Sequence, residues 1–246
     1  MSVGVVIPCY NEARRLDADE VRRLATSLPH GSGILLVDDG STDATGDLLA
    51  SIAASTPSVS VLTQSRNQGK AEAVRVGMLA LLDAGHGVVG FADADFATPV
   101  GEITRLASIC EQGPDLAVLG SRVAILGHRI QRTAFRHYTG RVFGTIGSIV
   151  LRFPVYDTQC GAKFFRAEPT VRRALGVPFT SRWSFDVELL GRLATPENGM
   201  VERLREIPLQ EWNHVGDSKL TLGSSLRATA DLWAVRRALR RWHTSA

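Results

Sequence analysis

Apolar residues in the first half of the chain gather in short runs, separated by segments with helical periodicity. The runs predict buried strands at 3–8, 33–37, 59–64, 88–92 and 115–121. The intervening segments predict helices at about 13–28, 43–55, 69–84 and 99–110. Apolar residues within 69–84 recur at 71, 74, 78, 81 and 82, the spacing of one helix face. Apolar strands that alternate with helices indicate an α/β fold, with a mostly parallel sheet covered on both faces.

The second half is less regular, yet no linker, repeat or low-complexity stretch interrupts it. Further helices are predicted at 131–151, 184–194 and about 224–242. The stretch 155–166 is rich in turn residues, and 201–212 contains a strand of mixed polarity, which indicates a sheet edge. We therefore expect one domain over residues 1–246.

Polar clusters directly follow several of the predicted strands, at Asn11–Glu12, Asp38–Asp39 and Asp93–Asp95. In parallel α/β sheets, ligands bind beyond the carboxyl ends of the strands. The carboxylates of Asp93 and Asp95 repel each other unless a cation lies nearby or one of them is protonated. A divalent cation shared with a substrate phosphate is one explanation, and an acidic turn that caps the next helix is the other. The common location of the clusters favours the cation.

Composition excludes several classes of protein. The cysteines at 9, 110 and 160 lie far apart, which argues against a disulfide framework or a zinc site and is typical of a reducing cytoplasm. No G-x-G-x-x-G follows a strand, which argues against a dehydrogenase. The sequence shows neither a leader nor an apolar run near the roughly 18 residues of a membrane span. We expect a soluble, cytoplasmic protein.

Charge is distributed unevenly along the chain. Residues 1–120 carry 8 basic and 15 acidic side chains, a balance of −7, whereas residues 121–246 carry 20 and 10, a balance of +10. This asymmetry predicts metal handling in the first half and an anionic partner in the second. Nucleic acid is not the expected partner, because no helix-turn-helix or RNA-binding aromatic motif is present.

Motifs in both halves resemble a known family. In the first half they are VVIPCYNEARRL (5–16), LLVDDGSTDAT (35–45), NQGKAEAVRVGM (67–78) and the aspartate pair, which resemble family 2 glycosyltransferases of the GT-A fold. In the second half they are GSR (120–122), DTQCGAKFF (157–165), RWSFDVELL (182–190) and GDSKL (216–220). The latter resemble the dolichyl-phosphate glucosyltransferase branch and its bacterial polyprenyl-phosphate relatives. The resemblance covers nearly the whole chain and implies a Rossmann-like GT-A domain.

The resemblance implies a site for a nucleoside-diphosphate sugar in residues 1–120. The loop under the nucleoside would consist of Pro8, Tyr10, Asn11 and Glu12. Glu12 is suited to accept hydrogen bonds from ribose hydroxyls, and Asp39 can accept one from the imide N–H of the base.

The diphosphate would lie beside the aspartate pair. Lys70 could reach a phosphate or a carboxylate of the site. The resemblance implies that Asp95 coordinates Mg²⁺ or Mn²⁺ and that Asp93 binds ribose or sugar hydroxyls. Alternate residues of a strand face opposite ways, so the chain must turn at Ala94 for both carboxylates to serve one site. A metal there would neutralise the departing nucleoside diphosphate.

Basic residues of the second half are candidates for binding the acceptor. Arg122, Arg132 and Lys219 could bind its phosphate, because guanidinium and ammonium groups suit phosphate oxygens. The alternative is a solvated basic surface.

Acidic and aromatic candidates accompany these basic residues. Asp157 is either the general base for a hydroxyl acceptor or a residue that organises the acceptor loop with Gln159 and Lys163. Asp186 is expected in the acceptor or sugar pocket. Trp183 is either a platform for a sugar or part of the core.

The branch implies transfer of glucose, with inversion, from UDP-glucose to a polyprenyl phosphate. GDP-mannose remains open as donor, since Asp39 can bond either base. The sequence shows no membrane anchor of the kind that eukaryotic members of the branch carry, so a soluble hydroxyl acceptor is the alternative. A sugar-phosphate nucleotidyltransferase would need a glycine-rich loop after the first strand, and a non-catalytic sensor conflicts with the intact aspartates.

The helix predicted at about 224–242 combines arginines with leucines and tryptophans. It could lie on the inner face of an anionic membrane as a peripheral contact. Alternatively, its apolar side packs on the domain, or on a second copy in a homodimer.

Overall fold

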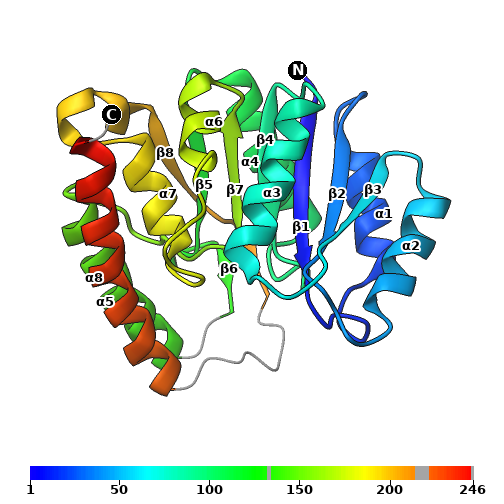
Figure 1. The fold of residues 1–246 in the computed structure, drawn as a ribbon, viewed down its shortest axis with the longest axis horizontal. Helices are drawn as coiled ribbons and strands as arrows, with labels where there is room; N and C mark the ends of the chain where they lie inside the picture. Colours follow the sequence, from blue (N-terminus) through cyan, green and yellow to red (C-terminus); the bar gives the residue numbers. More distant parts are fainter. Residues whose placement is uncertain (132–133, 214–221, 245–246) are drawn as a thin grey trace.

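A seven-stranded sheet forms the centre of the protein (Figure 1). The computed structural model describes residues 1–131, 134–213 and 222–244. The strands are β1 Val3–Cys9, β2 Gly33–Asp38, β3 Val59–Thr63, β4 Val88–Ala92, β5 Ala117–Ser121, β7 Ala162–Arg166 and β8 Leu204–Pro208. Their order is β3-β2-β1-β4-β7-β5-β8, and only β7 runs antiparallel to its described neighbours. The expected mostly parallel sheet in a single domain is confirmed.

Helices cover both faces of the sheet. On one face lie α1 Ala18–Ser27, α2 Thr45–Ser55 and α4 Val100–Gln112. On the other lie α3 Lys70–Asp83, α5 Ala134–Leu151, α6 Pro169–Leu175, α7 Phe185–Leu193 and α8 Leu222–Thr244. Successive side chains of β1 alternate between two hydrophobic cores, with Val5 and Ile7 on the α1 side and Val6 on the α3 side. Burial on both faces explains why β1, β2 and β4 are almost entirely apolar.

Strand β7 is the main element that the sequence pattern missed, because 155–166 was expected to be turn-rich. It lies between β4 and β5, where Lys163 is opposite both Phe91 and Leu119. A lysine at the second position and an arginine at the last position of this five-residue strand hide the apolar pattern, and only long-range pairing places the segment in the sheet. The edge position expected for a strand in 201–212 is confirmed, since β8 pairs with β5 at the end of the sheet.

The first helix begins at Ala18, later than its apolar pattern suggests. Asp17 is the N-cap, and its carboxylate accepts a hydrogen bond from the N–H of Asp19 at 2.8 Å. Before it, the N–H groups of Arg15 and Leu16 both donate to the carbonyl of Glu12 at 2.9 Å. The chain between β1 and α1 is therefore an ordered loop at the carboxyl edge of the sheet, which is the lower edge in Figure 1.

Helices α5 and α8 lie side by side at one end of the sheet (Figure 1). The apolar side of α8, with Leu232, Val235 and Leu239, is buried against α5 and α7. Packing on the domain was one of the alternatives for this helix. None of the helices within the described ranges is both long and apolar enough to cross a membrane.

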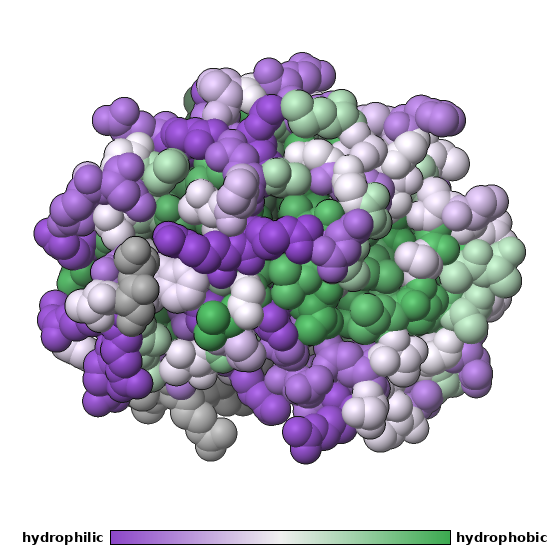
Figure 2. Space-filling view, turned by 45° about the horizontal axis from the view of Figure 1, so that its top comes forward, coloured by the Kyte–Doolittle hydropathy of each residue, from purple (hydrophilic) through white to green (hydrophobic). Residues whose placement is uncertain are grey.

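The opposite end of the sheet is less completely covered. Figure 2 shows a hydrophobic area right of centre, on the side of the molecule that carries β2 and β3. Leu62 of β3 and Val76 of α3, which pack against the core on the α3 side of the sheet, are only partly buried. This area lies away from α5 and α8, so the two ends of the sheet differ in their surfaces.

A second sheet of two short strands lies beyond β5 and β8. It pairs β6 Arg129–Ile130 in parallel with β9 Glu211–Trp212. The N–H of Arg129 also donates to the carbonyl of Gln210 at 2.7 Å. This small sheet extends the carboxyl edge and gives the loops after β5 and β8 a fixed position.

Candidate functional site

The loops after β1 and β2 hold each other at the carboxyl edge of the sheet. Asn11 has a left-handed backbone, with φ of 53°. Its N–H donates to Ser41 Oγ at 3.0 Å, and its side-chain oxygen accepts from the N–H of Thr42 at 2.9 Å. The N–H of Glu12 donates to Thr45 Oγ1 at 2.8 Å. These contacts fix the loop of Pro8, Tyr10, Asn11 and Glu12 that was expected under the nucleoside, and its binding role stays a prediction.

The aspartates that follow β2 organise the backbone around them. Asp38 accepts a hydrogen bond from the N–H of Ser41 at 2.9 Å. Asp39 is buried, and its two oxygens accept from the N–H groups of Gln68 and Gly69, both at 2.7 Å. Asp39 thereby ties the β2 loop to the start of α3. Each carboxylate oxygen can accept a second hydrogen bond, so its expected contact with the base remains a prediction.

The carboxylates of Asp93 and Asp95 lie where β4 ends, and each faces a cation. The chain turns here as expected, because the N–H of Phe96 donates to the carbonyl of Asp93 at 3.2 Å and Phe96 has a φ of 47°. Lys70 Nζ lies 2.5 Å from Asp93 Oδ1, and an Arg15 guanidinium nitrogen lies 3.4 Å from Asp95 Oδ2. The four side chains are partly exposed. They are therefore accessible to a ligand.

Negative charge is concentrated around Asp95. Burial raises the pKa of Asp95, and the nearby charge of Asp93 raises it further. Burial lowers the pKa of Lys70, but the charges of Asp93, Asp186 and Asp95 outweigh this effect, so the pKa of Lys70 is raised. A cation bound beside Asp95 is the ligand that this local field favours.

The donor set suits a divalent cation shared with a substrate. Within the described part of the chain no group of three or more His, Cys, Asp or Glu side chains could enclose a metal ion. Mg²⁺ in nucleotide enzymes is usually bound by one or two carboxylates together with substrate phosphates. Asp95, with Asp93 beside it, fits that arrangement. The expected role of Asp95 as the metal ligand stays a prediction.

The loop before β7 packs tightly on Asp93. The N–H of Asp93 donates to the carbonyl of Gly161 at 3.0 Å. A Cβ at position 161 would lie only 2.1 Å from Asp93 Oδ2, so any other residue would displace this carboxylate. The glycine of the DTQCGAKFF motif thus belongs to the site, although the motif lies far from Asp93 in sequence.

A buried ion pair lies behind the aspartates. Lys163 Nζ lies 2.7 Å from Asp186 Oδ1, and both side chains are buried. The ammonium group also donates to the carbonyl of Cys160 and lies 5.3 Å from the centre of the Phe91 ring. Burial raises the pKa of Asp186, while Lys163 and Lys70 act in the opposite direction. Asp186 is therefore placed inside the protein next to Lys163, and the contact with an acceptor expected for it stays a prediction.

Asp157 is held by Arg122. Its Oδ2 accepts from Arg122 Nε at 2.7 Å and from the Arg122 N–H at 3.0 Å, and its Oδ1 accepts from the second guanidinium nitrogen at 2.8 Å. The N–H of Gln159 donates to the same Oδ1 at 3.1 Å. Burial lowers the pKa of Arg122, but Asp157 raises it by more. Of the two alternatives for Asp157, this geometry favours the organiser of the loop, and it pairs Arg122 with a carboxylate rather than leaving it open to solvent.

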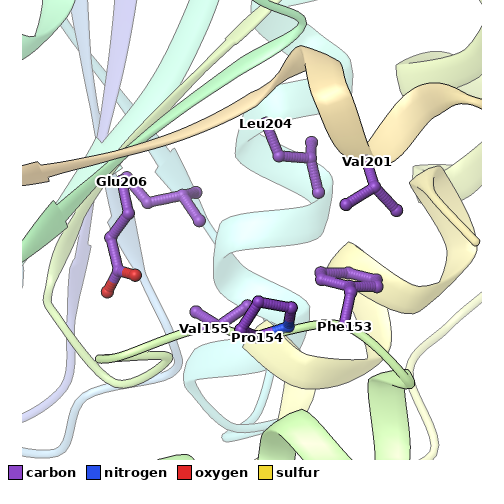
Figure 3. A pocket seen from close by; sticks show the side chains of 7 residues that line it. Phe153, Pro154, Val155, Val201, Leu204 and Glu206 are labelled. Carbon is purple, nitrogen blue, oxygen red and sulfur yellow. The ribbon is translucent and has the colours of Figure 1, made fainter. Parts of the chain in front are cut away.

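Glu206 on β8 is a residue that sequence reasoning missed. Its carboxylate accepts from the N–H groups of Tyr156 and Asp157, at 2.8 and 2.6 Å. It also lines a small cavity of about 80 Å³ with Phe153, Pro154, Val155, Val201 and Leu204 (Figure 3). Ligand pockets are typically several times larger, on the order of 300 Å³ or more. This cavity is thus too small to be the substrate site. Glu206 holds the loop that carries Asp157 through its hydrogen bonds to the backbone.

The remaining candidates fall into two groups. Arg132 and Lys219 lie outside the described residues. Trp183 is described and exposed, which excludes the core-packing alternative for its side chain.

Comparisons with known proteins agree with this arrangement. The sequence model of Glycosyl transferase family 2 matches residues 4–172. A dolichyl-phosphate beta-glucosyltransferase of Trichomonas vaginalis is 32% identical over 239 residues, which is 92% of this chain and 68% of that protein. The enzyme of the same name from Saccharomyces cerevisiae is 31% identical over 258 residues, or 96% of this chain and 74% of that one.

Solved structures with the same fold are also known. A glucosyl-3-phosphoglycerate synthase from Mycobacterium tuberculosis, in complex with Mn²⁺, UDP and glucosyl-3-phosphoglycerate, has a TM-score of 0.67 and 18% identity, covering 96% of this chain and 79% of that one. Mannosyl-3-phosphoglycerate synthase from Rubrobacter xylanophilus has a TM-score of 0.70 and 18% identity, covering 98% and 74%. The resemblance found in the motifs is confirmed, and the chain belongs to glycosyl transferase family 2.

Proposed function

We propose that the protein is an inverting, metal-dependent hexosyltransferase that moves glucose from UDP-glucose to a polyprenyl phosphate of the dolichyl type. The observation that carries the proposal is the position of Asp93 and Asp95 at the end of β4, in partly exposed ion pairs with Lys70 and Arg15. The curated relatives of similar sequence are dolichyl-phosphate beta-glucosyltransferases, which supports both the sugar and the acceptor.

The geometry of the carboxyl edge supports a diphosphate donor. Lys70 is at the first position of α3, where helix N–H groups and a lysine favour an anion. Asp95 would hold Mg²⁺ or Mn²⁺, and a bound metal would neutralise charge on the departing diphosphate. A structural neighbour has been solved with Mn²⁺ and UDP-glucose, which supports a metal and a UDP-sugar donor.

The state of Asp157 supports a phosphate as the nucleophile. A hydroxyl acceptor needs a general base, which must have a lone pair directed at the acceptor. Asp157 instead accepts hydrogen bonds from Arg122 and Gln159 on both oxygens. A phosphate monoester is already ionised at neutral pH. Its oxygen can attack the anomeric carbon as the bond to the diphosphate oxygen breaks, with no proton to remove.

A lipid acceptor requires access to a membrane, and we propose a peripheral contact on the cytoplasmic side. Tyr138, Val142 and Ile149 form an exposed apolar stripe along α5. On the neighbouring α8, Trp233 is exposed beside Arg236, and Arg237 and Arg240 line the same shallow depression. Exposed aromatic and aliphatic side chains next to arginines suit an anionic lipid surface. A homodimer that covers this face is the alternative outcome.

The test is release of UDP from UDP-glucose in the presence of Mn²⁺, with and without a short polyprenyl phosphate. Release that the lipid phosphate stimulates and that Asp95→Ala abolishes would support the proposal. If 3-phosphoglycerate or another soluble hydroxyl compound stimulates release and the lipid phosphate does not, the acceptor is soluble. In that case the lipid part of the proposal is wrong while the donor part stands.

A further inference from the structure

Arg182 lies at the corner of the site where the β2 loop meets the start of α3. Its Cγ and Cδ are 3.2 Å, and its Nε is 3.4 Å, from the position that a Cβ on Gly69 would occupy. Gly69 has a φ of 97° and donates its N–H to Asp39, and the next residue is Lys70. The guanidinium stem therefore crosses the chain one residue before the lysine that pairs with Asp93.

Hydrogen bonds to the two neighbouring helices hold the segment that carries Arg182 in place. Ser181 Oγ accepts from the N–H groups of Trp183 and Ser184, at 3.2 and 2.9 Å, and donates to Asp231 of α8 at 3.0 Å. Immediately before it, the N–H and hydroxyl of Thr180 both donate to the buried Glu188. These contacts anchor the backbone to α7 and α8. The side chains of Arg182 and Trp183 are both exposed to solvent.

Arg182 differs from the other arginines around the site. Arg15 is paired with Asp95, Arg122 with Asp157 and Arg192 with Glu188. Across the ranges that the structure describes, no carboxylate forms an ion pair with Arg182. A guanidinium on a braced segment, next to a left-handed glycine and a lysine, is arranged for an anion from outside the protein.

We infer that Arg182 binds a phosphate group of a substrate at the Gly69–Lys70 corner. The inference rests on the proposed function, because it concerns the same site. The phosphate belongs either to the diphosphate of the donor or to the acceptor, and both would present the same oxygens to the guanidinium. Glycine suits position 69, because its φ of 97° strains other residues and a Cβ there would press on the arginine stem at 3.2 Å.

The experiment measures UDP and uridine binding by calorimetry with Mn²⁺, for the wild type, Arg182→Gln, Arg182→Lys and the control Arg172→Gln. Arg172 is also exposed but pairs with Asp83 at the far end of α3. A hydrogen bond between charged partners at an exposed site corresponds to about a tenfold change in affinity. We expect Arg182→Gln to weaken UDP binding about tenfold and to leave uridine binding unchanged. Arg182→Lys should restore part of the affinity, and the control should behave as the wild type.

The acceptor arm measures KM for the polyprenyl phosphate in the same variants. An increase in this KM with unchanged UDP affinity assigns the phosphate to the acceptor. Unchanged values in both arms, or a fall in melting temperature that accounts for both losses, would overturn the inference. If the wild type itself binds neither UDP nor GDP with Mn²⁺, the proposed function fails, and the inference fails with it for that separate reason.

Discussion

The two halves of the site use the same residue types in opposite ways. In the first half, Asp93 and Asp95 pair with Lys70 and Arg15, and between 25% and 39% of each of these side chains is exposed. In the second half, Asp157 and Asp186 pair with Arg122 and Lys163, and at most 15% of any of these side chains is exposed. Partly exposed pairs exchange partners readily, whereas a buried pair is costly to open. The first pairs are suited to ligand exchange and the second to holding loops in place.

The largest contrast should appear in stability when one partner of each kind of pair is removed. We expect Lys163→Met to lower the free energy of unfolding by about 3–5 kcal/mol, because it leaves the Asp186 carboxylate buried without its cation. Lys70→Met should lower it by about 1 kcal/mol or less, because solvent screens the pair with Asp93. Urea denaturation of both variants measures the difference.

The control for this comparison is the double variant Lys163→Met/Asp186→Leu. It removes both charges and should recover most of the lost stability. Equal losses for Lys163→Met and Lys70→Met would show that burial does not separate the two pairs.

Substitution of Asp95, the proposed metal ligand, should give the next largest effect, on activity. We expect Asp95→Asn to fold normally and to lower kcat/KM by on the order of 10²–10³-fold, since charge on the departing diphosphate is no longer neutralised. Steady-state kinetics at several Mn²⁺ concentrations measure the loss. An Asp95→Asn variant that keeps the metal dependence of the wild type would place the metal elsewhere.

Loss of the Asp157 carboxylate should lower kcat less than loss of a general base would. We expect Asp157→Asn to lower kcat by about tenfold and to leave the shape of the pH–rate profile unchanged, because the carboxylate holds the loop with Arg122. A lost general base typically costs on the order of 10²–10⁴-fold and removes one limb of the profile. That larger result would favour a hydroxyl acceptor and return Asp157 to the role of base.

Substitutions on α5 should affect membrane binding and little else. Tyr138→Ser with Val142→Ser is expected to lower binding to vesicles of phosphatidylserine and phosphatidylcholine by about tenfold, since two apolar groups that are only partly buried in the interface contribute about 0.7 kcal/mol each, and about 1.4 kcal/mol is a factor of ten. Co-sedimentation measures it, with Val177→Ser as the control at another exposed apolar position. Vesicle binding that is unchanged, together with loss of a dimer in sedimentation, would assign this face to a second copy.

The smallest expected effect is on stability against pH. The raised pKa of Asp95 means that the folded state binds a proton more tightly than the unfolded chain does. Its charge therefore destabilises the fold at neutral pH, and the cost is relieved as the pH falls through its folded pKa. We expect metal-free Asp95→Asn to melt slightly higher than the wild type at pH 7, with the difference shrinking as the pH is lowered. A lower melting temperature for Asp95→Asn at pH 7 would contradict this.

Patterns of short range were enough to predict most of the fold and to place the loops after β1, β2 and β4 at one edge of the sheet. Buried parallel strands are apolar throughout, so β1, β2, β4 and β5 are visible as runs, and each donor loop follows one of them directly. The turns in these loops are also determined by residues only a few positions apart in the sequence. No pattern within a few residues of Lys163 or Glu206 indicates that Lys163 belongs to a strand or that Glu206 supports Asp157.

By itself, the sequence determined the alternation of elements, the edge of the sheet where the candidate site lies and the acidic pair at the end of β4. The tertiary structure decided which carboxylates form partly exposed ion pairs and which form buried ones, because their partners lie far away in the chain. Gly161 meets Asp93, Arg122 meets Asp157, and Arg182 crosses Gly69, all through packing between separate segments. Burial and the distance between charges exist only in the folded chain, and they set the energy of each pair.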